Sequence, residues 1–330
     1  VIVMPLSTPK IKVQSVEQLG GKVVLHGDVY DDAYQYAKQL EKDQDLVFIH
    51  PYDDIEVMAG QATIAKELLE QLPNMDKVFI PVGGGGLIAG MATYIKHYAP
   101  KIKVIGVEPE DSPTLYQALK DGKRTILSEV GRFADGVAVK QIGEKTYPIA
   151  KEVVDEVILV SNDEICAAIK DIYEDVRSIA EPAGALATAG VKKYIEQNNI
   201  ENENIVSIVS GANVNFDRLR YISERADLGE HNEAIIAAVI PEQPGSFLKF
   251  CQMLDNHAIT EFNYRYAPNK QAHIFVGVAL NNGLSEKEVL ISKLGQSFEV
   301  LDMSDNSIAK THIRYMVGGR ADTNNEVLYR

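Results

Sequence analysis

The sequence is poor in the features that mark disulfide scaffolds and membrane proteins. It has only two cysteines in 330 residues, Cys166 and Cys251, and they lie far apart in the chain. This count argues against a disulfide framework or a cysteine metal site and predicts a reduced, cytoplasmic setting. No apolar run reaches the roughly 18 residues that a membrane-spanning helix needs. No signal peptide is recognisable at the start, where Val1–Met4 lacks a charged lead and is followed by Pro5.

Positive charge is also scarce. Lysine and arginine together number 33 against 47 acidic residues, which gives a formal net charge of −14 at pH 7 without any basic block. We therefore expect neither nucleic acid nor a membrane surface as a partner. The seven histidines are scattered without the spacing of a metal-binding helix, so we expect no metal site.

The remaining composition is that of a globular chain of about two domains, with 45% hydrophobic and 24% charged residues. Strand and helix patterns alternate through the first part. Strands are expected at 1–4, 22–25, 46–49, 77–82, 103–107, 156–160 and 205–209, with helical segments between most of them. Ser161 and Glu164 have the spacing of a reciprocal capping pair at the start of one helix. This order predicts an α/β fold with a parallel sheet.

The pattern changes after Gly229. Strands are expected at 234–240, 259–267, 272–280 and 298–303, with helices at 246–254 and 285–295. The order βαββαβ is that of a small split-βαβ sandwich. We therefore place a domain boundary near residue 229, which separates residues 1–228 from a second, α+β domain at 229–330.

Four consecutive glycines, Gly83–Gly86, follow the strand at 77–82 and precede a helix. Glycine permits positive φ angles and leaves backbone N–H groups unobstructed, so this segment is a candidate phosphate cradle. A tight turn without a ligand is the alternative. Glu108 and Ser210–Asn213 also lie at strand ends, where open parallel sheets bind ligands. A dinucleotide site is disfavoured because the unbroken glycines lack the side chains of G-x-G-x-x-G.

Six segments together carry a resemblance to a known family. They are Pro81–Leu87, Ala134–Val137, Glu181–Ala185, Ser210–Asn213, Pro241–Phe247 and Glu261–Arg265. In order and spacing they resemble biosynthetic threonine dehydratase (threonine ammonia-lyase) over nearly the whole chain. The last two segments resemble the ACT-like regulatory, allosteric module of that family.

The resemblance implies a pyridoxal-phosphate lyase with the tryptophan-synthase-β fold, which converts L-threonine to 2-oxobutanoate and ammonia in isoleucine biosynthesis. The backbone N–H groups expected to hold the cofactor phosphate belong to Gly83, Gly84, Gly85, Gly86 and Leu87. Ser210 is expected to contact the pyridine nitrogen through its hydroxyl. A hydroxyl leaves that nitrogen neutral, which favours β-elimination over transamination. The alternative for Ser210 is a hydroxyl that caps a turn.

The family's Schiff-base lysine is expected upstream of Val1, so no catalytic residue is assigned in this chain. Lys10 and Lys12 do not match its surroundings. We therefore expect an incomplete core, with a small-lobe remnant at 1–55, a large lobe at 56–228 and one ACT-like subdomain, and we expect this chain to be inactive alone. The alternative is a non-catalytic regulatory subunit that binds an amino acid or phosphate.

The resemblance also implies isoleucine and valine as effectors and a homotetrameric assembly. Phe247 and Tyr264 match positions that line the effector pocket, and ordinary core packing is the alternative for both. Related enzymes bind a cation at a glutamate, a carbonyl and an acid. Glu108 and Ser112 match the first two, but Thr114 replaces the acid, so we expect Glu108 to orient backbone groups instead.

Overall fold

The computed structural model describes residues 1–309 except 7, 9, 29, 132, 215, 230–231, 256, 268–270 and 307–308. The last part of the predicted second domain, 310–330, lies outside the described residues. Within the described part, every helix is too short or too polar to cross a membrane.

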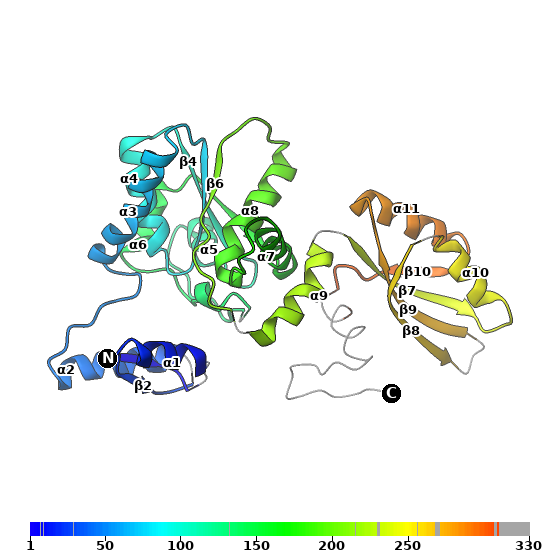
Figure 1. The fold of residues 1–330 in the computed structure, drawn as a ribbon, viewed down its shortest axis with the longest axis horizontal. Coiled ribbons are helices and arrows are strands. Elements are labelled where there is room, and N and C mark those ends of the chain that lie inside the picture. Colours follow the sequence, from blue (N-terminus) through cyan, green and yellow to red (C-terminus); the bar gives the residue numbers. More distant parts are fainter. Residues whose placement is uncertain are drawn as a thin grey trace.

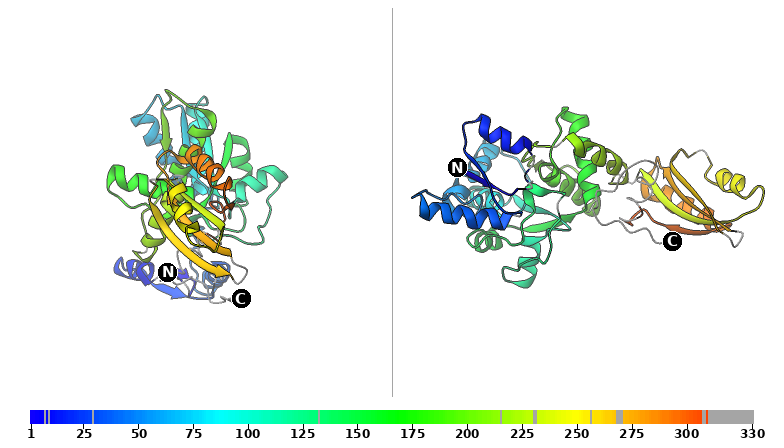
Figure 2. Two further views of the ribbon diagram at one scale, coloured as in Figure 1. Left: turned by 90° about the vertical axis from the view of Figure 1, so that its right-hand side faces the viewer. Right: turned by 90° about the horizontal axis from the view of Figure 1, so that it is seen from below.

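The first part of the chain is a small α/β unit. Its parallel strands are β1 (Ile2–Met4) and β2 (Val23–Leu25), and its helices are α1 (Lys10–Gln18) and α2 (Tyr30–Asp43). These four elements agree with the expected alternation. Figure 2 shows this unit and the C-terminal sheet toward opposite ends of the central part.

The prediction of a strand at 46–49 is wrong. Residues 46–50 form no strand, and the side chains of Val47 and Ile49 are 89% and 74% exposed. The rings of Phe48 and His50 instead contact Tyr34 of α2. The β-branched residues Val47 and Ile49 raise the strand propensity of this segment. Among the described residues, however, β1 and β2 pair only with each other, so neither forms strand hydrogen bonds with residues 46–49.

The central sheet is parallel, as the sequence predicts. Its strands lie in the order β5-β4-β3-β6, with bounds β3 Lys77–Pro81, β4 Lys103–Pro109, β5 Glu156–Val160 and β6 Ile205–Ser207. Val104 faces one buried cluster, whereas Ile105 and Val107 face the other. Burial on both faces explains why β3 and β4 read as continuous apolar runs.

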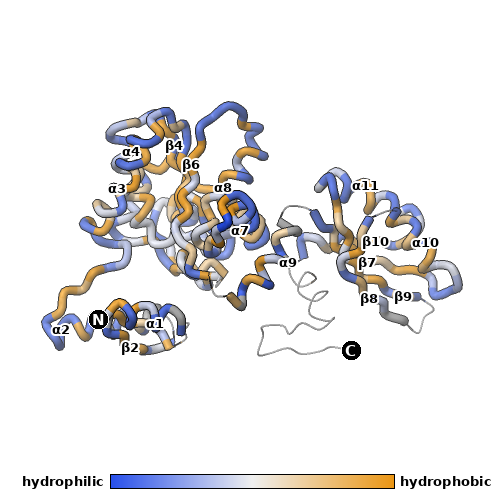
Figure 3. The backbone as a smooth tube through the Cα atoms, viewed as in Figure 1, coloured by the Kyte–Doolittle hydropathy of each residue, from blue (hydrophilic) through white to orange (hydrophobic). Residues whose placement is uncertain are grey.

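Helices cover both faces of this sheet (Figure 1). One face packs against α3 (Ile55–Gln71), α4 (Gly86–Tyr98), α5 (Thr114–Asp121) and α6 (Thr146–Val153). The other packs against α7 (Asn162–Val176), α8 (Pro182–Asn198) and α9 (Leu219–Gly229). Two short 3₁₀ turns, η1 (Asp135–Val137) and η2 (Phe216–Arg218), complete this part. Figure 3 shows apolar residues along the strands and mainly polar ones on outer helix surfaces.

After α9 the chain forms an antiparallel sheet in the order β10-β7-β9-β8. The strands are β7 (Glu233–Pro241), β8 (Ile259–Ala267), β9 (Gln271–Ala279) and β10 (Glu299–Asp302), with helices α10 (Ser246–Met253) and α11 (Gly283–Gly295). This confirms the expected βαββαβ order, and Phe250, Leu290 and Leu294 fill the core under the helices. The domain boundary near 229 stays a prediction.

The start of α7 confirms the predicted capping pair. Ser161 Oγ accepts the Glu164 amide at 3.2 Å, and the Glu164 carboxylate accepts the Ser161 amide at 2.6 Å. Two amides that the first helical turn leaves without intrahelical partners are thereby satisfied.

Replacing this cap tests its contribution. We expect Ser161→Ala to lower the free energy of unfolding by about 1 kcal/mol, because the Glu164 amide loses its acceptor. The exposed Ser128, which starts no helix, is the matched control. Ser128→Ala should stay within about 0.5 kcal/mol of the parent in denaturant unfolding. Equal values for the two variants would contradict the capping role.

Candidate functional site

The turn between β3 and α4 is built from glycine, and its carbonyl groups are fixed from outside. Gly85 has φ +90°, a left-handed conformation that favours glycine. The Gly83 carbonyl oxygen accepts a hydrogen bond from Thr114 Oγ1 at 3.0 Å. The Gly84 carbonyl oxygen accepts from Thr146 Oγ1 at 2.7 Å and from the Gly143 amide at 3.1 Å. The Gly85 carbonyl oxygen accepts from the Ala89 amide at 3.0 Å.

These anchors orient the amides of the turn. In a planar trans peptide the N–H points opposite to the preceding carbonyl, so anchored carbonyls turn the amides of Gly84, Gly85 and Gly86 the other way. Within the described part of the chain, the amides of residues 84–88 have no hydrogen-bond acceptor. They form a compact group of donors at the N-terminus of α4, which suits a phosphate.

Close backbone approaches join this turn to the other three sequence motifs of the large lobe. A Cβ on Gly83 would lie 2.9 Å from Val137 Cα, one on Gly136 2.9 Å from Ala183 Cβ, and one on Gly184 2.1 Å from the Gly211 carbonyl oxygen. The segments 83–86, 134–137, 181–185 and 210–213 therefore contact one another in series. Sequence spacing alone gives no sign of this order of contacts.

Tyr52 forms a wall of the turn that the sequence did not reveal. A Cβ on Gly84 would lie 2.2 Å from Tyr52 Cδ2, and one on Gly86 would lie 2.7 Å from the Tyr52 carbonyl oxygen. The ring of Tyr52 packs edge-on against His50 at 4.6 Å. Burial lowers the pKa of His50. A single aromatic residue before a helix carries no sequence signal for this contact.

Asp53 ties the Tyr52 segment to α6. Its carboxylate accepts the amides of Glu144 at 2.9 Å, Lys145 at 2.7 Å and Thr146 at 3.2 Å. A carboxylate at a helix N-terminus is favourable for the helix dipole. The same helix turn places Thr146 Oγ1 on Gly84, so Asp53 supports an anchor of the glycine turn. In the sequence, the pair Asp53-Asp54 indicates only a turn.

Ser210 lies beyond the C-terminal end of β6. It is exposed, and its Oγ lies 3.5 Å from the Ala183 carbonyl oxygen, the weak limit of a hydrogen bond. Its neighbour Gly211 accepts the Glu181 amide at 3.1 Å. The Ser210 hydroxyl therefore lies beside Ala183 and is accessible from solvent.

Glu108 orients backbone groups, as expected. It is fully buried at the end of β4, and its carboxyl accepts the amides of Leu115 and Tyr116, both at 2.8 Å, at the start of α5. Burial raises the pKa of Glu108 to about 7, partly offset by these hydrogen bonds. Among the described residues, no group of three or more His, Cys, Asp or Glu side chains has metal-binding geometry.

Lys12 reaches the same region from α1. Its Nζ lies 2.9 Å from Asp135 Oδ2, beside the η1 turn that packs on Gly83. Arg218 approaches Asp135 from the other side at 3.8 Å and donates to the Phe133 carbonyl at 2.9 Å. The Lys12 amine is thus paired with a carboxylate.

Phe247 of α10 and Tyr264 of β8 lie together. Their ring centroids are 5.8 Å apart in an edge-to-face arrangement, and each side chain is about two-fifths exposed, at 40% and 39%. The Tyr264 hydroxyl donates to Glu242, a bond that raises the pKa of Tyr264. Both rings are therefore partly accessible from solvent.

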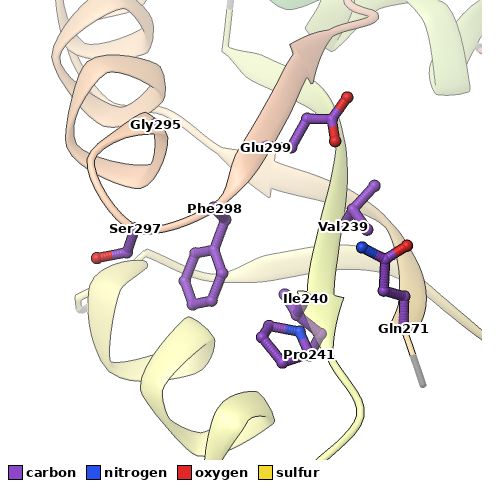
Figure 4. Close-up of a pocket in the computed structure, with 8 residues that line it drawn as sticks. All are labelled: Val239, Ile240, Pro241, Gln271, Gly295, Ser297, Phe298 and Glu299. Carbon is purple, nitrogen blue, oxygen red and sulfur yellow. The ribbon is translucent and has the colours of Figure 1, made fainter. Parts of the chain in front are cut away.

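A separate, open pocket lies where β7 ends, beside the turn between α11 and β10 (Figure 4). It is lined by Val239, Ile240, Pro241, Gln271, Gly295, Ser297, Phe298 and Glu299. Neither ring of the Phe247 pair belongs to this lining.

Comparison with known proteins gives consistent matches. Residues 1–211 match the family described as pyridoxal-phosphate dependent enzyme, and residues 224–313 match the C-terminal regulatory domain of threonine dehydratase. The chain is 54% identical over 323 residues to L-threonine dehydratase biosynthetic IlvA of Pasteurella multocida, with 98% of this chain and 63% of that protein covered. For the Escherichia coli protein of the same name, identity is 53% over 320 residues, with 97% and 62% covered.

The fold also matches solved structures. The processed form of threonine deaminase isoform 2 from Solanum lycopersicum superposes with a TM-score of 0.67 at 49% identity, covering 68% of this chain and 62% of that one. The chain thus spans less than two thirds of the length of these curated relatives.

Two glycine substitutions test the close packing of the motifs. We expect Gly184→Ala to destabilise the fold by about 1–3 kcal/mol, because the new methyl group meets the Gly211 carbonyl oxygen. Gly60, in the middle of α3, has open space around its Cβ position. Gly60→Ala should stabilise the protein by up to about 1 kcal/mol through helix propensity. In denaturant unfolding, the two substitutions should change the free energy of unfolding in opposite directions.

Proposed function

Because the chain belongs to the pyridoxal-phosphate-dependent enzyme family and joins to it the regulatory domain of threonine dehydratase, we propose that it forms part of a threonine ammonia-lyase. In this reaction L-threonine becomes 2-oxobutanoate and ammonia, in isoleucine biosynthesis. The observation that carries the proposal is the glycine turn with anchored carbonyls and unbonded amides. The identity of about one half to curated dehydratases over nearly the whole chain supports it.

The proposed cofactor phosphate is bound by the amides of Gly83, Gly84, Gly85, Gly86 and Leu87. Their donors converge at the start of α4, where the helix dipole favours an anion. The turn has no side chains of its own, and the Tyr52 ring lies against it at Gly84. The preorganised carbonyl anchors mean that little conformational freedom is lost on binding.

Ser210 is the proposed contact for the pyridine nitrogen. When bound, pyridoxal phosphate supplies an electron sink for the β-elimination. The Ser210 hydroxyl carries no charge, so it stabilises no proton on that nitrogen and keeps the sink weak. Such a partner favours loss of the β-hydroxyl of the substrate over transamination.

Several finer assignments complete the proposal. We infer a division into residues 1–228 and 229–330, isoleucine and valine as effectors near Phe247 and Tyr264, a homotetramer and a cytoplasmic location. The regulatory-domain match supports the effector role. Both cysteines are unpaired, Cys166 in the core and Cys251 half-buried, as a reducing compartment requires.

Binding of pyridoxal phosphate to the 330-residue chain tests the cradle. Gly85→Ala introduces a methyl group 2.7 Å from Ile142 and strains a positive φ, so the donors should lose their alignment. We expect affinity to fall about ten- to a hundredfold by titration calorimetry, the equivalent of one charge-assisted hydrogen bond.

The control for that variant is Gly122→Ala. Gly122 also has a positive φ, +68°, but lies outside the turn in open space. Its substitution should cost stability without changing the affinity. Pyridoxal, which has no phosphate, should bind weakly to the parent. Equal affinity for the two ligands would contradict a phosphate cradle and favour a different use of the turn.

Isoleucine binding tests the effector proposal. We expect Phe247→Ala to weaken isoleucine binding about tenfold, because an apolar ring contact is lost. The adjacent Leu248 is 61% exposed, and Leu248→Ala should leave the affinity unchanged. If both variants bind isoleucine as the parent does, the effector site lies elsewhere.

A further inference from the structure

Glu108 connects the end of β4 to the glycine turn through one hydroxyl. Its Oε1 lies 2.9 Å from Thr114 Oγ1, and the same Oγ1 lies 3.0 Å from the Gly83 carbonyl oxygen. Glu108 and Thr114 are both fully buried. The carboxyl, the hydroxyl and the carbonyl therefore form a short chain whose first two members are fully buried and whose last belongs to the half-buried Gly83.

The number of protons in this chain is limited. A threonine hydroxyl has one proton to donate, and a peptide carbonyl can only accept. If Glu108 were ionised, two acceptors would compete for the Thr114 proton, and one short oxygen–oxygen contact would have no proton in it. Each contact has a proton of its own only if the carboxyl brings a second one.

We propose that Glu108 is a positioning residue that acts as a neutral acid: its carboxyl donates a proton to Thr114 Oγ1, and the Thr114 hydroxyl donates to the Gly83 carbonyl. This arrangement fixes the peptide that carries the Gly84 amide, one of the proposed phosphate donors. Loss of the carboxyl proton would draw the hydroxyl toward the stronger, charged acceptor and release the Gly83 carbonyl.

The surroundings of Glu108 agree with a neutral carboxyl. Burial is the largest influence on its pKa and raises it to about 7, while the bonds from Leu115, Tyr116 and Thr114 lower it. The groups that contact it from α5 and the glycine turn are the amides of Leu115, Tyr116 and Thr114, the Thr114 hydroxyl and, through that hydroxyl, a carbonyl. None of the residues that hydrogen-bond to Glu108 has a charged side chain.

The sign of the pH effect follows from this shift. The carboxyl has its ordinary pKa of 4.5 when unfolded and a higher one when folded. Between these values the folded state binds more protons, so stability from this group is greatest below pH 4.5 and falls as pH rises through 7.

The test follows the Gly84 amide by NMR in the full chain between about pH 5.5 and pH 8.5, a range that brackets the raised pKa. We expect its chemical shift to titrate near pH 7 in the parent and in Thr114→Ser, which keeps the hydroxyl. The transition should disappear in Thr114→Val, which keeps the shape but removes the hydroxyl, and in Glu108→Gln, which removes the titrating group.

A Gly84 shift that is flat in the parent, or a transition that persists in Thr114→Val, would overturn the proposal. Should Glu108→Gln fail to fold, the carboxyl carbon of Glu108 in the labelled parent gives the same information. A transition near pH 7 supports the neutral acid, and one near 4.5 refutes it.

Ligand binding gives the functional readout, and this arm rests on the proposed function. Sulfate is the probe, because its charge is constant over this range, and its affinity should fall severalfold above pH 7 in the parent but not in Glu108→Gln. If the NMR transition is observed but pyridoxal phosphate does not bind at about pH 6, the proposed function alone is refuted. Binding of pyridoxal phosphate without the NMR transition would sink the role of Glu108 alone.

Discussion

The site depends on hydrogen bonds to the carbonyl groups of a turn that has no side chains of its own. Gly83 and Gly84 are held by hydroxyls from α5 and α6, and Gly85 is held by the first turn of α4. Because each peptide is planar, an anchored carbonyl determines the direction of the next amide. The helices on this face of the sheet therefore set the donor geometry at β3.

The same constraint extends outward through close backbone contacts. Val137 packs on Gly83, and Asp135 of the same 3₁₀ turn is paired with Lys12 from the N-terminal unit and approached by Arg218 of η2. Further along α9, Arg225 donates to Asp163 at 2.5 Å, which fixes that helix on α7. The helix that leads into the regulatory sheet is thus attached to α7, and the η2 turn just before it contacts η1.

Periodicity and capping were sufficient to predict most of the elements. Strands buried on both faces leave continuous apolar runs, and Ser161 with Glu164 marks a helix start by chemistry local to a few residues. The prediction failed at 46–49, because strand formation needs a partner that propensity does not supply. It also omitted α6, whose start is capped from far away in sequence by Asp53.

The predicted site residues came from local motifs, whereas the missed ones act over long sequence distances. Tyr52 and Thr146 touch the glycine turn only because the fold brings them there. No spacing rule connects a tyrosine before α3 to a glycine after β3. The proton on Glu108 is likewise a property of burial, which becomes visible only when the chain around it is folded.

Phosphate recognition by backbone amides has a consequence for specificity. Amides at a helix start bind a phosphate group whatever the rest of the ligand is, so under the proposed function the glycine turn would supply affinity but little discrimination. Under the proposed function, the choice of reaction must come from groups that reach the ring, and Ser210 is an exposed polar residue in the motif segment 210–213. Its position depends on Gly211, whose carbonyl fits against Gly184 with no space for a methyl group. The close fit of Gly184 against Gly211 therefore helps to determine where the Ser210 hydroxyl lies.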